Sequence, residues 1–199
     1  MERPSLESWA FADYSLAVNR DTLEQRLQTL LGGSEKSAEH VLLCIDLDGD
    51  AGAEPTSKAN VEKAFLGMLM KDWVWASSIE DCVARIRHSE FVMLMAFCPL
   101  SRALHSARLL RLWFRAKVES TKQPGNIPDI RIGIALAVSG CDPRQVLAFA
   151  RNACESAKRR GRGSICVHRI EKSPRTTCIE CVAADRRTVE EKYHDNDND

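Results

Sequence analysis

The chain has 199 residues, of which 44% are apolar and 28% are charged, a composition that suits one soluble domain with a full hydrophobic core. Lysine and arginine together number 28, as do aspartate and glutamate, so no basic excess points to nucleic acid or to an anionic membrane as the main partner. The first residues lead into no apolar segment of a signal peptide, and the longest apolar stretches, such as residues 91–100, are far too short to span a membrane. We therefore expect a cytoplasmic protein.

Helical spacing of apolar residues alternates along the chain with short apolar runs that are typical of buried strands. The predicted elements, in chain order, are a helix over 21–31, a strand over 41–45, a helix over 60–73, strands over 82–86 and 90–97, a helix over 99–117, a strand over 130–138, a helix over 143–159 and a strand over 164–168. Only Arg87, His88 and Ser89 separate the two central strands, which predicts a hairpin. The order indicates an α/β (α+β) fold in which helices flank a mixed sheet of about five strands.

The C-terminal residues 171–199 lose this periodicity and end in an acidic, polar sequence, which predicts a disordered tail. Within it, Cys178 and Cys181 have the spacing of a metal or redox pair but lack a second Cys or His pair. Two thiols in a flexible tail are therefore the preferred interpretation over a zinc or redox site. The other cysteines lie mostly in apolar runs, and we expect no disulfides in a reducing compartment.

The hairpin segment 81–91 resembles the region of diguanylate cyclases that ends in the signature Gly-Gly-Asp/Glu-Glu-Phe, which here reads Arg-His-Ser-Glu-Phe. Four other segments resemble motifs of the same family in order and spacing. They are residues 13–20 (Asp-x-Leu-Thr-Gly-Leu-x-Asn-Arg), 45–48 (the metal strand), 130–135 (Ser-Ile-Gly-Ile-Ala) and 150–162 (Ala-Asp-x-Ala-Leu-Tyr-x-Ala-Lys-x-x-Gly-Arg). The chain thus resembles a GGDEF domain, with its nucleotidyl cyclase-like palm, over 12–170, preceded by a short extension over 1–11.

This resemblance implies a site that holds divalent metal on carboxylates and GTP phosphates on cations, because active members join two GTP molecules into cyclic di-GMP. Asp46 matches the first metal carboxylate, and Glu90 is the retained fourth letter of the signature. Lys158 and Arg162 match the phosphate-contacting pair. A solvated basic cap at a helix end is an equally good interpretation of these two cations.

The signature departs from the family pattern where the chemistry is most demanding. Arg87 and His88 replace two glycines, so side chains enter the space of the nucleotide, and a positive φ there becomes costly. Ser89 replaces an acidic metal ligand, and a neutral hydroxyl is a poor substitute for it. Phe91, the fifth letter, is most simply a core strand residue.

Guanine recognition and product inhibition are altered as well. Counted without gaps from Asp46, the guanine-reading Asn and Asp of the family fall on Glu54 and Lys63, which cannot reproduce their donors and acceptors. The product-inhibition motif Arg-x-x-Asp keeps Asp81 but has Ser78 in place of the arginine that would contact phosphate and guanine. We therefore expect a degenerate domain with no catalytic residues.

Three functions follow from these residues. The first is a catalytically inactive GGDEF protein that acts as a regulatory or protein-interaction module in bacterial cyclic di-GMP signalling, with a phosphodiesterase or an effector adaptor as partner by family analogy. The alternative is a non-hydrolysing sensor of GTP and Mg²⁺ that uses Asp46, Glu90, Lys158 and Arg162. A residual diguanylate cyclase is the weakest hypothesis. The first function needs no cofactor, Mg²⁺ is expected only together with a nucleotide, and homodimerisation stays open.

Overall fold

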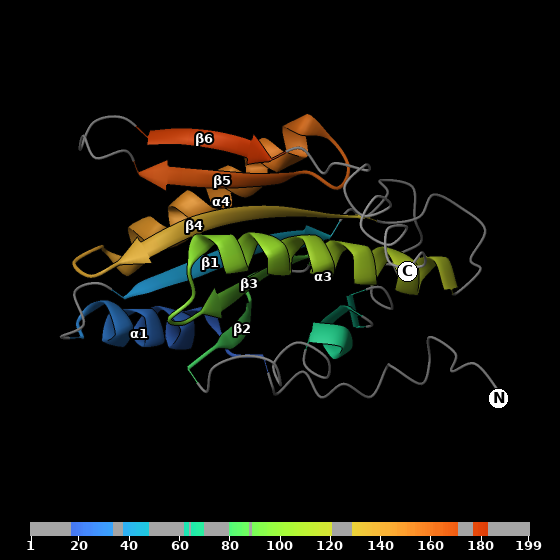
Figure 1. The fold of residues 1–199 in the computed structure, drawn as a ribbon. Coiled ribbons are helices and arrows are strands. Elements are labelled where there is room, and N and C mark those ends of the chain that lie inside the picture. Colours follow the sequence, from blue (N-terminus) through green and yellow to red (C-terminus); the bar gives the residue numbers. More distant parts are fainter. Residues whose placement is uncertain are drawn as a thin grey trace, which may run out of the picture.

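The structure is a computed structural model that describes residues 17–33, 38–47, 62–63, 65–69, 80–87, 89–120, 129–170 and 177–182. Its elements follow the predicted order (Figure 1). They are α1 (Arg20–Leu31), β1 (Glu39–Leu47), β2 (Cys82–Arg85), β3 (Glu90–Met95), α3 (Leu100–Ser120), β4 (Ile130–Val138), α4 (Pro143–Arg160), β5 (Ile165–Ile170) and β6 (Thr177–Val182). Of the helix predicted over 60–73, residues 62–63 and 65–69 are described and are helical.

The strands form one mixed sheet in the order β2-β3-β1-β4-β5-β6, which runs from the bottom to the top of Figure 1. Neighbouring strands are antiparallel except β4 and β5, which are parallel. A parallel pair requires a crossover connection, and α4 provides it. The predicted hairpin and the predicted α/β fold with a mixed sheet are both confirmed.

Helices cover both faces of the sheet (Figure 1, with α3 in front and α4 behind). α1 and α4 pack on one face, and α3 packs on the other together with residues 65–69. The side chains of β1 alternate between these layers: Ile45 belongs to the core on the α3 side and Cys44 to the core on the α4 side. Asp46, two residues after Cys44, therefore points toward α4.

Helix α4 has a defined start and a defined end. The side chain of Asp142 accepts the N–H of Arg144 at 3.0 Å, and Pro143 occupies the first turn, both of which favour helix initiation. Gly161, with a φ of 106°, ends the helix. These caps define the two ends of α4. None of the helices in the described part of the chain is long and apolar enough to cross a membrane.

Strand β6 corrects the prediction for the C-terminal segment. Residues 177–182 pair with β5 in antiparallel register, so the prediction of disorder is wrong for them, and the sheet has six strands rather than about five. The segment Thr-Cys-Ile-Glu-Cys-Val contains several residues that favour strands, and its partner β5 completes the pairing. The other residues of the predicted tail lie outside the described residues.

The cysteine expectation also needs correction. Cys166 of β5 is disulfide-bonded, whereas the sequence predicts no disulfide framework. In the β5–β6 register, Cys166 lies directly opposite Cys181. Cys178 and Cys181 are thus residues of a strand and not of a flexible tail.

His168 is a buried polar residue in this part of the sheet. It is 4% exposed, and its ring stacks on Phe149 of α4 with a centroid distance of 4.1 Å and an interplanar angle of 9°. Neither ring nitrogen has a hydrogen-bond partner among the described residues. Burial therefore lowers the pKa of His168 below its ordinary value, and the folded protein holds the ring neutral.

We expect His168 to make the protein sensitive to acid. Below about pH 6.5 the unfolded chain binds a proton at this residue that the folded chain does not bind, so stability falls until the lowered folded pKa is reached. Replacing His168 with phenylalanine should remove this part of the loss, as measured by urea denaturation between pH 7.5 and 5. The matched control is His105→Phe, on the exposed side of α3. An unchanged pH dependence in His168→Phe would contradict the assignment.

Candidate functional site

Two carboxylates and one arginine are brought together by the sheet alone. The register pairs Asp46 of β1 with Glu90 of β3 on one side and with Arg131 of β4 on the other. Directly opposed residues point to the same face of a sheet, so all three side chains face α4. Arg131 Nη1 lies 3.7 Å from Asp46 Oδ2.

Helix α4 adds three more charged side chains above these strand ends. Arg151, Glu155 and Lys158 are four and three residues apart and so lie on one side of the helix. Lys158 Nζ lies 3.0 Å from Asp46 Oδ1 and 2.9 Å from Glu155 Oε1, and Arg151 Nε lies 2.7 Å from Glu90 Oε1. Three carboxylates thus face three cations. We call this set the ion-pair cluster: Asp46, Glu90, Glu155, Arg131, Arg151 and Lys158.

The two strand carboxylates of the ion-pair cluster are shielded from water, whereas the side chain of Glu155 is 58% exposed. Asp46 is 8% exposed and Glu90 is 9% exposed. Burial raises the pKa of Asp46 above its ordinary value, and the hydrogen bond from Lys158 and the charges of Lys158 and Arg131 offset part of this effect. Burial alone lowers the pKa of Lys158, but its hydrogen bonds to Glu155 and Asp46 raise this pKa above the usual range. Lys158 therefore remains a cation at neutral pH.

Gly133 of β4 allows α4 to come this close to the sheet. A Cβ at this position would overlap the backbone nitrogen of Cys154 and the carbonyl oxygen of Ala150, and it would lie 2.7 Å from the Cα of Cys154. Only glycine permits such a close approach of two backbones. The approach in turn lets Arg151 and Lys158 reach the carboxylates of the strands.

Two buried thiols lie beneath the cluster. Cys44 is 1% exposed and Cys154 is 2% exposed. The Cys154 thiol donates to the carbonyl oxygen of Arg131 at 3.7 Å, and Cys44 Sγ lies 4.0 Å from Glu90 Oε1. The hydrogen bond with Cys154 and burial raise the pKa of Cys44 well above its ordinary value. Cys44 is therefore a neutral thiol, whereas metal coordination requires a thiolate.

The described residues on either side of the hairpin turn are joined by backbone hydrogen bonds. The N–H of Arg87 donates to the carbonyl of Glu90, and the N–H of Glu90 donates to the carbonyl of Arg87, each at 3.3 Å. The N–H of Leu47 donates to the carbonyl of Ser89 at 3.0 Å and ties the turn to β1. Among the described residues, Phe97 is the one non-glycine residue with a positive φ. The expected cost of a positive φ therefore does not arise at Arg87, and His88 lies outside the described residues.

Of the residues expected at the product and base sites, Asp81 and Lys63 are described. Asp81 precedes β2, and its carboxylate accepts the N–H of Ala96 at 2.6 Å, so it holds the end of β3. Lys63 is helical and half-buried. Ser78 and Glu54 lie outside the described residues.

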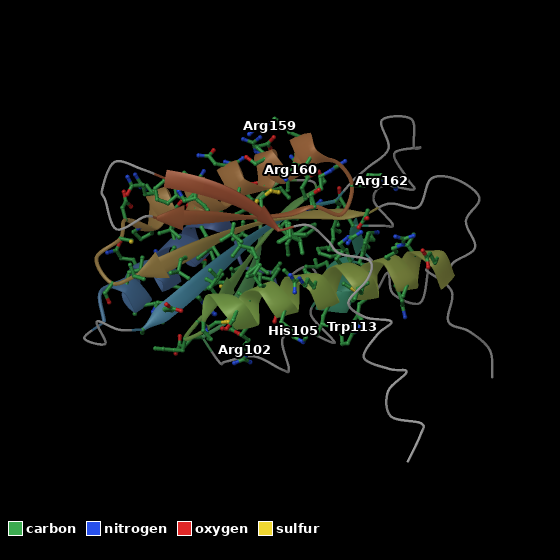
Figure 2. All side chains as sticks on the ribbon, turned by 45° about the horizontal axis from the view of Figure 1, so that its top comes forward. Arg102, His105, Trp113, Arg159, Arg160 and Arg162 are labelled. Atoms are coloured by element: carbon green, nitrogen blue, oxygen red, sulfur yellow. The ribbon has the colours of Figure 1, made fainter. Side chains whose placement is uncertain are left out.

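The two cations that are expected to contact phosphate lie in different environments. Lys158 belongs to the ion-pair cluster, whereas Arg162 is exposed in the turn after α4. Figure 2 shows Arg162 near the end of this helix, with Arg159 and Arg160 on the last turn. Phe91 is fully buried and packs against Phe65 at a ring-centroid distance of 5.4 Å, in agreement with its predicted core role.

Arg131 and Arg151 contact the predicted carboxylates Asp46 and Glu90 but are not among the residues predicted from the sequence. A usable signal was present. Arg131 stands at the serine letter of the Ser-Ile-Gly-Ile-Ala motif, and Arg151 stands at the aspartate letter of the Ala-Asp-x-Ala-Leu-Tyr motif. A new arginine inside a motif near a carboxylate pair is the pattern to look for.

Comparison with known proteins agrees with this fold. The family model described as "Diguanylate cyclase, GGDEF domain" matches residues 66–164. No curated protein sequence matches the chain. The GGDEF domain of DgcB from Caulobacter crescentus, solved in complex with c-di-GMP, aligns with a TM-score of 0.60 and 18% identity over 76% of this chain and 91% of that chain.

Two further solved structures are similar. The active GGEEF domain of a diguanylate cyclase from Vibrio cholerae aligns with a TM-score of 0.62 and 18% identity over 78% of this chain and 99% of that chain. The diguanylate cyclase SiaD from Pseudomonas aeruginosa, solved in complex with its activator SiaC, aligns with a TM-score of 0.61 and 19% identity over 81% of this chain and 63% of that chain. The chain belongs to the GGDEF domain family.

GGDEF domains use Mg²⁺ with GTP, but the residues at this position do not fit a divalent metal. Both oxygens of Asp46 and both oxygens of Glu90 face cationic nitrogens of the chain itself. The third signature letter is Ser89, which brings no charge. In the described part of the chain, no group of three or more His, Cys, Asp or Glu side chains could hold a metal ion.

Proposed function

We propose that this chain is a GGDEF-domain protein without diguanylate cyclase activity and that it acts as a regulatory or protein-interaction module in cyclic di-GMP signalling. The observation that carries the proposal is the pairing of Asp46 and Glu90 with Arg131, Arg151 and Lys158. Cyclase chemistry needs these carboxylates for metal. Here they neutralise cations of the same chain.

The altered signature supports the same proposal. Arg87 is exposed at the tip of the hairpin and Ser89 lacks a carboxylate, so the turn offers neither the open backbone nor the anionic ligand that the reaction requires. The altered turn and the pairing of the retained carboxylates are separate obstacles to catalysis, and removing one would not remove the other.

The partner is proposed by analogy with the family. The structure of SiaD with SiaC is that of a diguanylate cyclase with a protein activator, and a catalytically silent GGDEF domain can retain a surface of this kind without its chemistry. We propose a cytoplasmic phosphodiesterase or effector adaptor as the partner. The GTP sensor is less well supported, because Lys158 already donates to Asp46 and Glu155.

Purified protein incubated with GTP and either Mg²⁺ or Mn²⁺ should yield no cyclic di-GMP above a no-enzyme blank, as measured by chromatography with mass detection. The active GGEEF domain from Vibrio cholerae serves as the positive control under the same conditions. Product that disappears in Asp46→Ala would contradict the proposal. If the interaction role is correct, adding the protein to a cyclic di-GMP phosphodiesterase of the same cell should change the turnover of that enzyme.

A further inference from the structure

We propose that Arg131 and Arg151 exclude divalent metal ions from the carboxylate pair Asp46 and Glu90. The proposal deepens the proposed loss of catalysis by assigning the exclusion to two residues. It is tested without nucleotide, so it can fail while the chain remains inactive for another reason, such as its altered turn.

All four carboxylate oxygens of Asp46 and Glu90 contact cationic side chains. Arg151 forks onto Glu90, with Nε 2.7 Å from Oε1 and Nη2 3.2 Å from Oε2. Asp46 is divided between two cations, with Lys158 Nζ 3.0 Å from Oδ1 and Arg131 Nη1 3.7 Å from Oδ2. A metal ion would have to displace at least one of these partners before it could bind.

The net charge of the ion-pair cluster also disfavours a metal ion. The cluster contains three carboxylates and three cations, so it carries no net negative charge to attract Mg²⁺ or Mn²⁺. Guanidinium groups do not lose their proton in proteins, so a rise in pH cannot release the carboxylates from Arg131 or Arg151. Mg²⁺ gives up its water reluctantly and gains little from a site that is already neutral.

Arg131 and Arg151 are both partly buried. The side chains of Arg131 and Arg151 are only 16% and 30% exposed. Arg131 belongs to a central strand, and Arg151 lies on the part of α4 that passes over Gly133. Their partial burial limits the exchange of the carboxylates for water. Lys158 also contacts Asp46, at 3.0 Å, and it is unchanged in the variants below, so a gain in Mn²⁺ affinity would report on the arginines.

Mn²⁺ binding in the absence of nucleotide tests the proposal. The wild-type protein should show no specific Mn²⁺ binding by electron paramagnetic resonance, whereas the double variant Arg131→Ser/Arg151→Ala should bind at least about tenfold more tightly, a change of about 1.4 kcal/mol. Adding Asp46→Asn to the double variant should abolish the gain. Arg159→Ala, on the exposed last turn of the same helix (Figure 2), is the matched control and should behave as wild type.

A second pair of variants keeps the test decisive if the double variant does not fold. Arg151→Gln preserves side-chain length and removes the charge, so it should gain Mn²⁺ affinity, whereas Arg151→Lys keeps the charge and should not. Circular dichroism confirms that each variant is folded. The proposal is overturned if wild-type protein binds Mn²⁺ as tightly as the variants, or if the gain persists when Asp46 is neutralised.

Discussion

Replacing Gly133 with alanine should destabilise the protein by about 3 kcal/mol and lower its melting temperature by roughly 6 to 12 °C. The added Cβ would overlap backbone atoms of Cys154 and Ala150. A backbone cannot move aside as the end of a flexible side chain can, so α4 would have to rise from the sheet. This shift would also lengthen the contacts of Arg151 and Lys158 with the strand carboxylates. Urea denaturation followed by far-UV circular dichroism measures the loss.

Gly140→Ala is the matched control for this prediction. Gly140 has a φ of +86°, and a Cβ there would meet nothing within 4 Å, so its replacement costs only the backbone strain of about 1 kcal/mol. A larger loss for Gly133→Ala than for Gly140→Ala therefore isolates the steric contribution. Equal losses would show that α4 does not rest on Gly133 as described.

Replacing Asp46 with alanine should destabilise the protein by about 2 kcal/mol, whether or not Mg²⁺ is present. The change leaves Arg131 and Lys158 without their shared carboxylate, and removing one partner of a buried ion pair costs about 3–5 kcal/mol. We expect a smaller loss of about 2 kcal/mol because the side chain of Lys158 is 32% exposed, so water screens part of the effect. The double variant Asp46→Ala/Arg131→Ala should lose less than the sum of the two single losses.

The exposed ion pair of Arg144 and Glu24 provides the comparison. The side chain of Arg144 is 79% exposed, so Arg144→Ala should change stability by less than about 0.5 kcal/mol. If Mg²⁺ stabilised wild-type protein but not Asp46→Ala, Asp46 would be a metal ligand and not an internal counter-ion. If Asp46→Ala cost as little stability as Arg144→Ala, the ion-pair cluster would contribute nothing to stability.

The elements of this fold could be predicted because their signals are local. Short stretches of sequence contain the patterns that predict them: the spaced leucines of α1, the apolar run of β1 and the turn residues 87–89. Periodicity detects such local patterns directly. Strand β6 was missed because its stability depends on pairing with β5. A short strand without its partner is hard to distinguish from an irregular segment.

The site could be predicted only in part for a related reason. Asp46, Glu90 and Lys158 stand in recognisable motifs, so a resemblance places them. Their actual partners follow from strand register and from the crossing of α4 over β4, and neither can be read from one segment alone. Arg131 is 85 positions from Asp46 in the chain but is its direct neighbour in the sheet. Charge pairing at this distance becomes visible only in the folded protein.

Isothermal titration of the purified protein with GTP and Mg²⁺, followed by product analysis of the same sample, tests the central claim most directly. Because Lys158, Arg131 and Arg151 are held by carboxylates of the chain, we expect no heat beyond that of dilution and no cyclic di-GMP. Saturable binding without product would support the GTP sensor instead. Saturable binding with cyclic di-GMP as the product would contradict the account.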